Sequence, residues 1–291
     1  MSLRKTIKHC LGYILVAGFA AGVASNVSAA DDAAPQGRIV VATVFSKPIY
    51  ADELEPGASE KLPSGLTDAQ RIQWQASQRN ERLSGMILKP LIDQYCQSHA
   101  CEPTDEEIAS FTQNLERSKQ RHIEEWKRKQ AALTAERQSP NVSDVQRKQI
   151  DEELKQLNSA LTMEGHFYDG ITPEQRATIE ASRPAREREI ARMMIRAWKL
   201  NKALYDEYGG SVIFQQAGIE PLGAYRAWLE AHEGKGDFQI LEPTLRTAFW
   251  AYFVSTGHNF IPIDKFQQET GLKSPFEKPW WLMDKKPEKT P

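Results

Sequence analysis

The chain has 291 residues, 40% of them hydrophobic, which is enough for one large hydrophobic core or two modest ones. Its 37 basic and 39 acidic residues give a formal net charge of −2 at pH 7, so a polyphosphate would meet no excess of cations. Basic runs such as 127–129 lie beside acidic residues, the pattern of a solvated helix face, and a nucleic-acid partner is therefore not expected.

The N-terminus has the pattern of a secretion signal. Arg4, Lys5 and Lys8 are followed by an uncharged apolar run over 11–24 and by small residues up to Ala30, near which we expect cleavage. The apolar run is shorter than the roughly 20 residues of a membrane-spanning helix, so a retained anchor is the less favoured alternative. Removing the leader takes away three cations and no anion, which lowers the formal net charge from −2 to −5.

The first regular elements are a strand and a long helix. Residues 39–45 are rich in β-branched side chains and predict one short N-terminal strand, which we expect Pro48 to end by removing a backbone donor. A helix is predicted to begin at Thr67 and to bend at Pro90. Apolar residues recur along it at spacings of three and four, which predicts a buried face made of Leu83, Met86, Ile87, Leu91 and Tyr95.

Cys96 and Cys101 lie at the end of this helix and just before the next one. A short loop can bring their Cα atoms within the about 4.4 to 6.8 Å that a disulfide requires, so we predict a disulfide that fixes the angle between the two helices. His99 between them suggests a Cys-x2-His-x-Cys metal site as the alternative, but no fourth ligand is evident in the sequence. A metal is therefore not expected.

Residues 104–162 predict a long projecting α-hairpin. Thr104 and Glu107 form a capping box at the start of its first helix, and Pro140 lies in the turn between the two helices. Each helix has only a thin apolar stripe, which can cover one partner but not two. The stripes comprise Ile108, Phe111, Leu115, His122, Trp126 and Leu133, and then Val145, Ile150, Leu154, Leu157 and Leu161.

Another helix is predicted to begin at Thr172, with Gln175 in the capping-box position. We expect Pro184 to interrupt it, because proline removes a helical hydrogen bond, and a second stretch to run from Ala185 to Tyr208. Gly209-Gly210 then ends the helical pattern.

Residues 209–282 predict a C-terminal helical region rich in aromatic side chains. Its expected elements are a short extended segment and three helices, at 211–214, 221–232, 243–255 and 263–270. Trp280 and Trp281 are expected to hold the end of this region against a core, because two unpacked indoles would leave a large apolar patch in water. Residues 283–291 are predicted to be a disordered tail.

Three stretches follow one another between Arg38 and Ile108: an apolar strand region, the end of one helix and the start of the next. They are 41–54 (VATVFSKPIYADEL), 91–95 (LIDQY) and 104–108 (TDEEI). This order resembles the N-terminal chaperone module of the SurA and PrsA-like periplasmic foldases. The family's Asn-Gly turn is Phe45-Ser46 here, and 55–80 is an extra segment.

The resemblance implies a mainly all-α fold, in which residues 31–208 form a SurA-N-like helical chaperone module. It also implies a periplasmic location and a chaperone or assembly factor that binds unfolded or exported polypeptides, with envelope or outer-membrane assembly components as further partners. Parvulin-type prolyl isomerase domains follow the module in this family. Residues 209–214 (GGSVIF) faintly resemble their Gly-Gly-Asp-Leu-Gly-x-Phe segment, but the expected His-x-Leu type strand is absent, so the isomerase domain is expected to be missing.

Client contact is assigned to methionine and aromatic side chains on two helices, because such side chains adapt to varied partners. The candidates are Met193, Met194 and Trp198 on the helix that ends at Tyr208, and Phe249, Trp250 and Phe253 on a later helix. Core packing is the competing interpretation for each of the six residues. The sequence does not predict the client or the oligomeric state.

Catalytic motifs were sought and not found. The sequence has no Gly-x-Ser-x-Gly elbow, no His-Glu-x-x-His zinc helix and no glycine-rich phosphate loop, so no catalytic residue and no cofactor are predicted. Two alternatives stay open. One is an envelope enzyme, isomerase-related or other, whose site is assembled from distant loops around His166, Asp169 or His258. The other is a scaffold of a single envelope complex.

Overall fold

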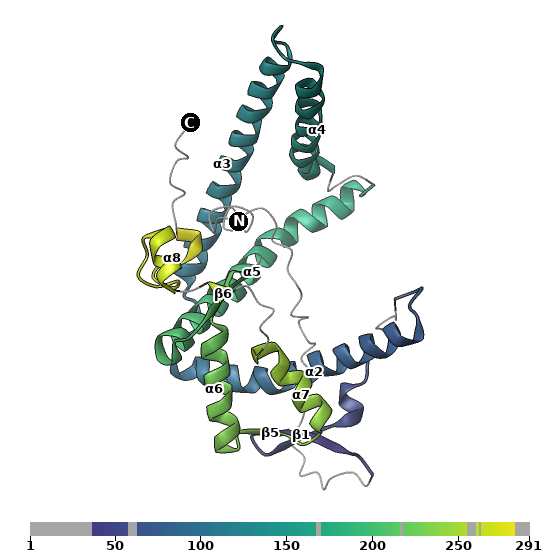
Figure 1. Ribbon diagram of the computed structural model, residues 1–291, viewed down its shortest axis with the longest axis vertical. Helices are drawn as coiled ribbons and strands as arrows, with labels where there is room; N and C mark the ends of the chain where they lie inside the picture. The colour runs from purple at the N-terminus through teal and green to yellow at the C-terminus, as the bar shows by residue number, and fades with distance from the viewer. Residues whose placement is uncertain are drawn as a thin grey trace. The chain divides into compact units, whose positions relative to one another are not determined.

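The computed structural model describes residues 37–57, 63–166, 170–215, 218–254, 260–261 and 263–282, and the expected leader and tail lie outside these ranges. The chain is mainly helical with a few short strands, which confirms the predicted fold class (Figure 1). None of the helices described combines the length and apolar character that a membrane span requires. In chain order the elements are β1 (Val40–Val44), β2 (Lys47–Tyr50), the 3-10 helix η1 (Ala51–Leu54), α2 (Asp68–Ser98), α3 (Asp105–Arg137), α4 (Asp144–His166), α5 (Pro173–Tyr208), β3 (Val212–Gln215), β4 (Gly218–Glu220), α6 (Leu222–Lys235), β5 (Phe238–Ile240), α7 (Pro243–Val254), β6 (Phe260–Ile261), α8 (Ile263–Thr270) and the 3-10 helix η2 (Trp280–Leu282).

The chain divides into two compact units. The first unit contains the residues up to Cys101 together with Trp198–Glu277, and the second contains Glu102–Ala197 and the residues from Lys278 onward. This division differs from the boundary expected at residue 208. Most of the C-terminal region shares a unit with the N-terminal strand, because β5 pairs directly with β1.

An antiparallel sheet of order β2-β1-β5 forms one side of the first unit. β1 pairs with β2 through a tight hairpin and with β5 from far along the chain, so that Thr43 faces both Pro48 and Gln239. Pro48 therefore does not end the strand, contrary to the prediction. It lies in the edge strand β2, where a residue without a backbone N–H is tolerated.

The β1–β2 hairpin turns at two residues with positive φ angles, 46° at Phe45 and 64° at Ser46. Positive φ at both central positions is what a two-residue type I′ turn requires, and it is the reason that Asn-Gly is favoured there. Phe45 packs against the core of the first unit. This contact offsets part of the cost of its positive φ, which a bulky side chain disfavours.

Ser46→Gly should raise the free energy of unfolding by about 0.5 to 1 kcal/mol, because glycine adopts the left-handed region without a steric cost. Ser46→Val should lower it by about 1 to 2 kcal/mol, because a β-branched side chain disfavours positive φ. Urea denaturation followed by circular dichroism measures both changes. Equal stabilities of the three proteins would contradict the turn geometry.

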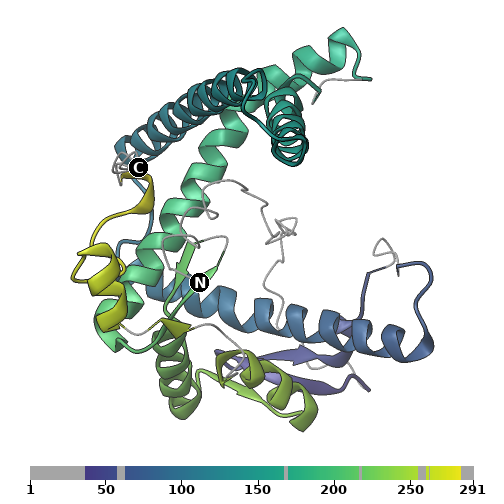
Figure 2. The same ribbon diagram turned by 45° about the horizontal axis from the view of Figure 1, so that its top comes forward.

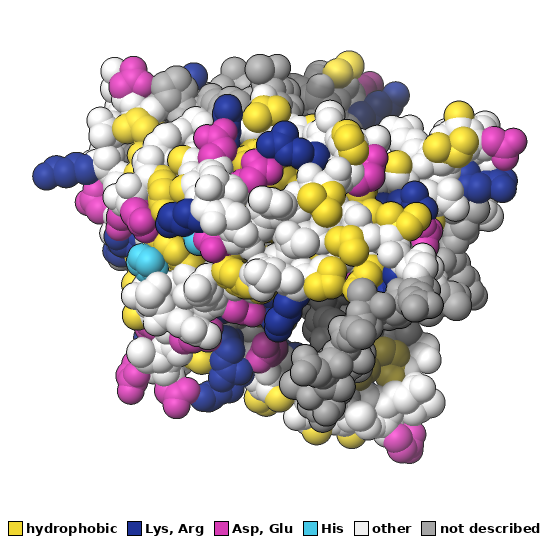
Figure 3. Space-filling model, turned by 90° about the horizontal axis from the view of Figure 1, so that it is seen from below, with side chains coloured by type: hydrophobic (Ala, Val, Ile, Leu, Met, Phe, Trp, Pro, Cys, Tyr) yellow, Lys and Arg dark blue, Asp and Glu magenta, His cyan; other side chains and the backbone are white. Residues whose placement is uncertain are grey.

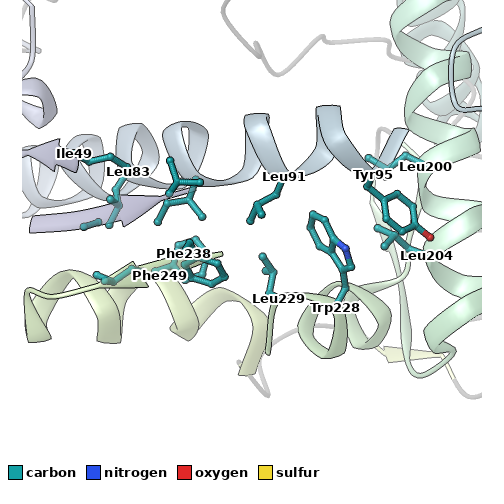
Figure 4. Close-up of a cluster of buried hydrophobic side chains, with 14 of the residues drawn as sticks. Ile49, Leu83, Leu91, Tyr95, Leu200, Leu204, Trp228, Leu229, Phe238 and Phe249 are labelled. Carbon is teal, nitrogen blue, oxygen red and sulfur yellow. The ribbon is translucent and has the colours of Figure 1, made fainter. Parts of the chain in front are cut away.

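The core of the first unit lies where α2, α6 and α7 pack against one another and the sheet. α2 contributes Leu83, Ile87 and Leu91, each 0% exposed, which confirms most of its predicted buried face, whereas Met86 is 37% exposed. In Figure 4 Leu83 and Leu91 point from α2 toward the side chains of β5, α6 and α7, among them Phe238, Leu229 and Phe249, while Leu200 and Leu204 approach from α5. Figure 2 shows α2 running alongside the strands that it covers.

The second unit is built on α3, α4 and most of α5. The predicted capping boxes are present: Glu107 N–H donates to the Thr104 hydroxyl at 3.2 Å, and Gln175 N–H donates to the Thr172 hydroxyl at 3.3 Å. A second core joins α3 and α5 through Ile108, Phe111, Ala191 and Ile195. The Trp281 ring lies 5.2 Å from that of Phe111, as expected for an indole that holds the chain end against a core.

α3 and α4 form the predicted antiparallel hairpin, side by side in Figure 1. On α4, Ile150 and Leu157 are the buried members of the predicted stripe, at 6% and 9% exposure, whereas Val145 is 68% exposed. Polar groups bridge the rest of the seam, including Lys129 to Glu153 at 2.9 Å. The two helices therefore share a thin and largely polar contact.

Pro184 does not interrupt α5, contrary to the prediction, and one helix runs from Pro173 to Tyr208. Pro184 is exposed, so the carbonyl group that loses its helical partner can hydrogen-bond to water. Ion pairs of i,i+4 spacing support the helix nearby, from Arg176 to Glu180 at 2.9 Å and from Arg183 to Glu187 at 2.6 Å.

Candidate functional site

The candidate site is a set of four aromatic side chains on α7, Phe249, Trp250, Tyr252 and Phe253, which we call the α7 aromatic surface. α7 begins at Pro243, whose fixed φ suits the first turn of a helix. The residue before it, Glu242, accepts hydrogen bonds from the backbone N–H groups of Thr244 and Leu245 at 3.1 and 2.5 Å. These bonds, chiefly that from Leu245, lower the pKa of Glu242. The Glu242 carboxylate therefore stabilises the start of α7 at pH values above its pKa, and this stabilisation is lost as the pH falls through that pKa.

Burial is graded across the α7 aromatic surface. Phe249 is 1% exposed and packs 5.9 Å from the ring of Phe238 on β5. Trp250 and Phe253 are half-buried, and their rings lie 5.5 and 5.6 Å from that of Phe249. Tyr252 is 40% exposed, with its ring edge-on to Phe253 at 5.2 Å. One core residue therefore anchors three rings that reach progressively further into solvent.

A polar contact orients the outermost ring. The Tyr252 hydroxyl donates to Glu220 Oε2 at 2.7 Å, which ties α7 to the end of β4. Leu241 and Val254, before and at the end of α7, are 55% and 49% exposed. On the face of the molecule in Figure 3, exposed hydrophobic side chains form several small groups separated by charged ones. Small groups of this kind suit weak contacts better than one permanent interface.

Three of the six predicted contact residues therefore lie together on α7, in different environments. Phe249 is a core residue, which was the competing interpretation for it. Trp250 and Phe253 have one side on the core and the other toward solvent. Tyr252, Leu241 and Val254 were not among the candidates. Each of them lies three or four residues from another apolar residue of this segment, so spacing alone does not distinguish them from buried residues, and their exposure in the folded chain identifies them.

The other three predicted residues lie on a different helix, α5. Met193 is 42% exposed, and Met194 packs against the second core, beside Ile195. Both belong to the second unit, whereas the half-buried Trp198 belongs to the first.

No catalytic arrangement is apparent in the described part of the chain. Its histidine, cysteine, aspartate and glutamate residues form no group of three that could hold a metal. The side chains of His166, Asp169 and His258 lie outside the described residues, so the loop-assembled enzyme site is untested. His232 and Asp237 do form a hydrogen-bonded pair, with Nδ1 and Oδ2 2.7 Å apart, and this pair closes the C-terminal end of α6.

The predicted disulfide is not formed in the structure. Cys96 and Cys101 are both buried, at 3% and 0% exposure, and no bond joins their sulfurs.

A shallow groove of about 420 Å³ lies along the α-hairpin. It is lined by Trp126, Lys129, Glu153, Gln156 and Leu157, so charged and amide groups surround one half-exposed indole. An apolar client segment would have to desolvate these polar groups, which makes the groove less favourable for such a segment than the α7 aromatic surface.

No protein-family model, no curated protein and no solved structure matches this chain.

Proposed function

We propose that this protein is an exported chaperone or assembly factor that binds apolar segments of unfolded polypeptides on the α7 aromatic surface. The graded burial of its four rings carries the proposal. Phe249 already fills its place in the core. The rings packed on it, Trp250 and Phe253, therefore keep part of their apolar area open to a partner.

Weak and reversible binding needs only a small exposed apolar area. A fully buried aromatic side chain covers about 150 to 250 Å², and covering a remaining third of it contributes about 1 to 2 kcal/mol. Three such rings with their exposed neighbours give a contact that holds a client segment and still releases it. Tyrosine and tryptophan also lose little side-chain entropy on binding, because they have only two side-chain torsions.

Two features of the sequence support export and the chaperone class. The leader has a positive start, an apolar run and small residues at its end. The order of the strand region and the two helices after it resembles the module of the SurA and PrsA-like foldases. Without a parvulin domain the function is binding alone, so an assay of prolyl-peptide isomerisation should show no turnover.

Suppression of aggregation tests the proposal. A chemically unfolded client is diluted into buffer with or without the mature protein, and light scattering is recorded. We expect the natural chain to lower scattering and the double variant Tyr252→Ser, Val254→Ser to lose at least half of this protection, because both side chains are exposed apolar groups at the end of α7.

Two controls make the test specific. Tyr252→Phe keeps the ring and loses only the hydroxyl, so it should protect as well as the natural chain. Ile72→Ser removes a 66% exposed apolar side chain from α2 and should also leave protection unchanged. Equal protection by the natural chain and the double variant would refute the assignment to α7, and no protection by the natural chain would refute the chaperone function.

A further inference from the structure

Two helices of the first unit end in the same way. At the end of α6, Gly236 has a φ of 79°, and the N–H of Asp237 donates to the carbonyl of His232 at 3.0 Å. At the end of α2, Ala100 has a φ of 49°, and the N–H of Cys101 donates to the carbonyl of Cys96 at 3.4 Å. A left-handed residue followed by a donor to the carbonyl five positions back is the 6→1 part of a Schellman motif, which both helix ends share.

This motif brings together the side chains of the donor and acceptor residues. In α6 these residues are His232 and Asp237, and their side chains are 2.7 Å apart. In α2 the same two positions are occupied by Cys96 and Cys101, both of them buried. The α6 pair shows, within the same chain, that side chains at these two positions point toward each other.

We propose that Cys96 and Cys101 are a redox modification site, a dithiol that closes reversibly into a disulfide across the end of α2. The oxidant is a disulfide-bearing compound or protein. One cysteine thiolate attacks it, forming a mixed disulfide and releasing one thiol. The second cysteine thiolate then attacks the protein sulfur of the mixed disulfide and releases the second thiol. The protein loses two electrons and two protons, and the oxidant's disulfide is reduced to two thiols.

The closed form would lock a polar cluster that joins the ends of α2 and α5. Tyr95 and His99 stack with their ring centroids 3.8 Å apart, and the Tyr95 hydroxyl donates to Glu207 Oε2 at 2.8 Å. His99 lies between the two cysteines in sequence, and its Nε2 is 3.5 Å from the same Glu207 oxygen. Fixing the turn at Ala100 would therefore also hold His99 against Glu207.

Burial sets the expected kinetics. Both sulfurs are shielded, so the thiols and the disulfide react only when the end of α2 opens locally. Oxidation of the folded chain should therefore be slow, and the disulfide once formed should resist reductant until the protein is unfolded.

The experiment uses the full chain with Cys10→Ser, so that only this pair can react. The folded protein is equilibrated in buffers of reduced and oxidised glutathione, quenched with acid, unfolded and treated with N-ethylmaleimide, and its intact mass is measured. The expected oxidised form is a monomer that has lost two hydrogens and takes up no maleimide. Its melting temperature should exceed that of the reduced form by about 4 to 8 °C. Hydrogen exchange over 96–101 should slow as well.

Uptake of two maleimides at every glutathione ratio would overturn the proposal, and so would products that are only mixed disulfides or linked dimers. The matched variant is Cys101→Ser, whose melting temperature should not change between the two buffers. If that variant does not fold, the mass measurement on the protein that keeps both cysteines still shows whether the disulfide forms. Neither readout depends on chaperone activity, so this proposal and the proposed function can fail separately.

Discussion

Gly223→Ala should lower the free energy of unfolding of the first unit by about 2 to 4 kcal/mol, although it adds only one methyl group. A Cβ at this position would lie 2.6 Å from the backbone nitrogen of Ser211 and 3.0 Å from the Cα of Gly210. Backbone atoms cannot rotate away as a side chain can. The Gly223 N–H also donates to the Ser211 carbonyl at 3.0 Å, so the start of α6 could move away only by losing this bond.

Gly234→Ala on the same helix is the matched control. No atom of the described residues lies within 4 Å of a Cβ built at Gly234, which lies within α6, so alanine should stabilise the chain by about 0.5 to 1 kcal/mol. Urea denaturation of the two variants should therefore give shifts of opposite sign. Equal shifts, or no loss in Gly223→Ala, would contradict the close approach of the two backbones.

Trp228→Ala should cost about 3 to 5 kcal/mol, because it removes the largest fully buried side chain of the chain's described part and leaves a cavity. The indole is 0% exposed and makes edge-on contacts with Tyr95 at 5.7 Å and with His232 at 5.0 Å. Trp228→Phe should cost less. It preserves part of the ring packing and removes an indole N–H that has no hydrogen-bond partner among the described residues.

Trp126→Ala is the control for residue type. Trp126 lies on α3 and is 36% exposed, so its loss should cost no more than about 1 kcal/mol. Circular dichroism is the appropriate probe, since each variant changes the tryptophan fluorescence. Similar costs for the two alanine variants would show that Trp228 does not hold the core together.

The Trp228 core and the α7 aromatic surface belong to one hydrophobic cluster, because Phe249 is a member of it and Trp250 and Phe253 pack on its edge. A loss of core packing should therefore weaken client protection even where no surface residue is changed. For this reason the functional variants are confined to exposed positions such as Tyr252 and Val254.

Local sequence patterns determined much of the helical framework. Thr104 and Thr172 each cap a helix as predicted, and Thr67, where a helix was expected to begin, caps α2, because a capping box satisfies backbone donors within four residues and needs no distant partner. The apolar spacing of α2 predicted the burial of Leu83, Ile87 and Leu91, but not the exposure of Met86. Signals of this kind depend only on neighbours in the chain.

The tertiary structure decided three other features. They are the effect of Pro48 and Pro184, the pairing of β5 with β1, and which residues form the α7 aromatic surface. Proline penalises a strand or helix only where a lost hydrogen bond stays unsatisfied, and an edge strand or a solvent-facing carbonyl removes that penalty. Strand pairing joins residues about 200 positions apart, a separation that no local spacing encodes. Apolar periodicity places Phe249, Trp250 and Phe253 on neighbouring faces of one helix, but which ring meets solvent depends on what packs against it.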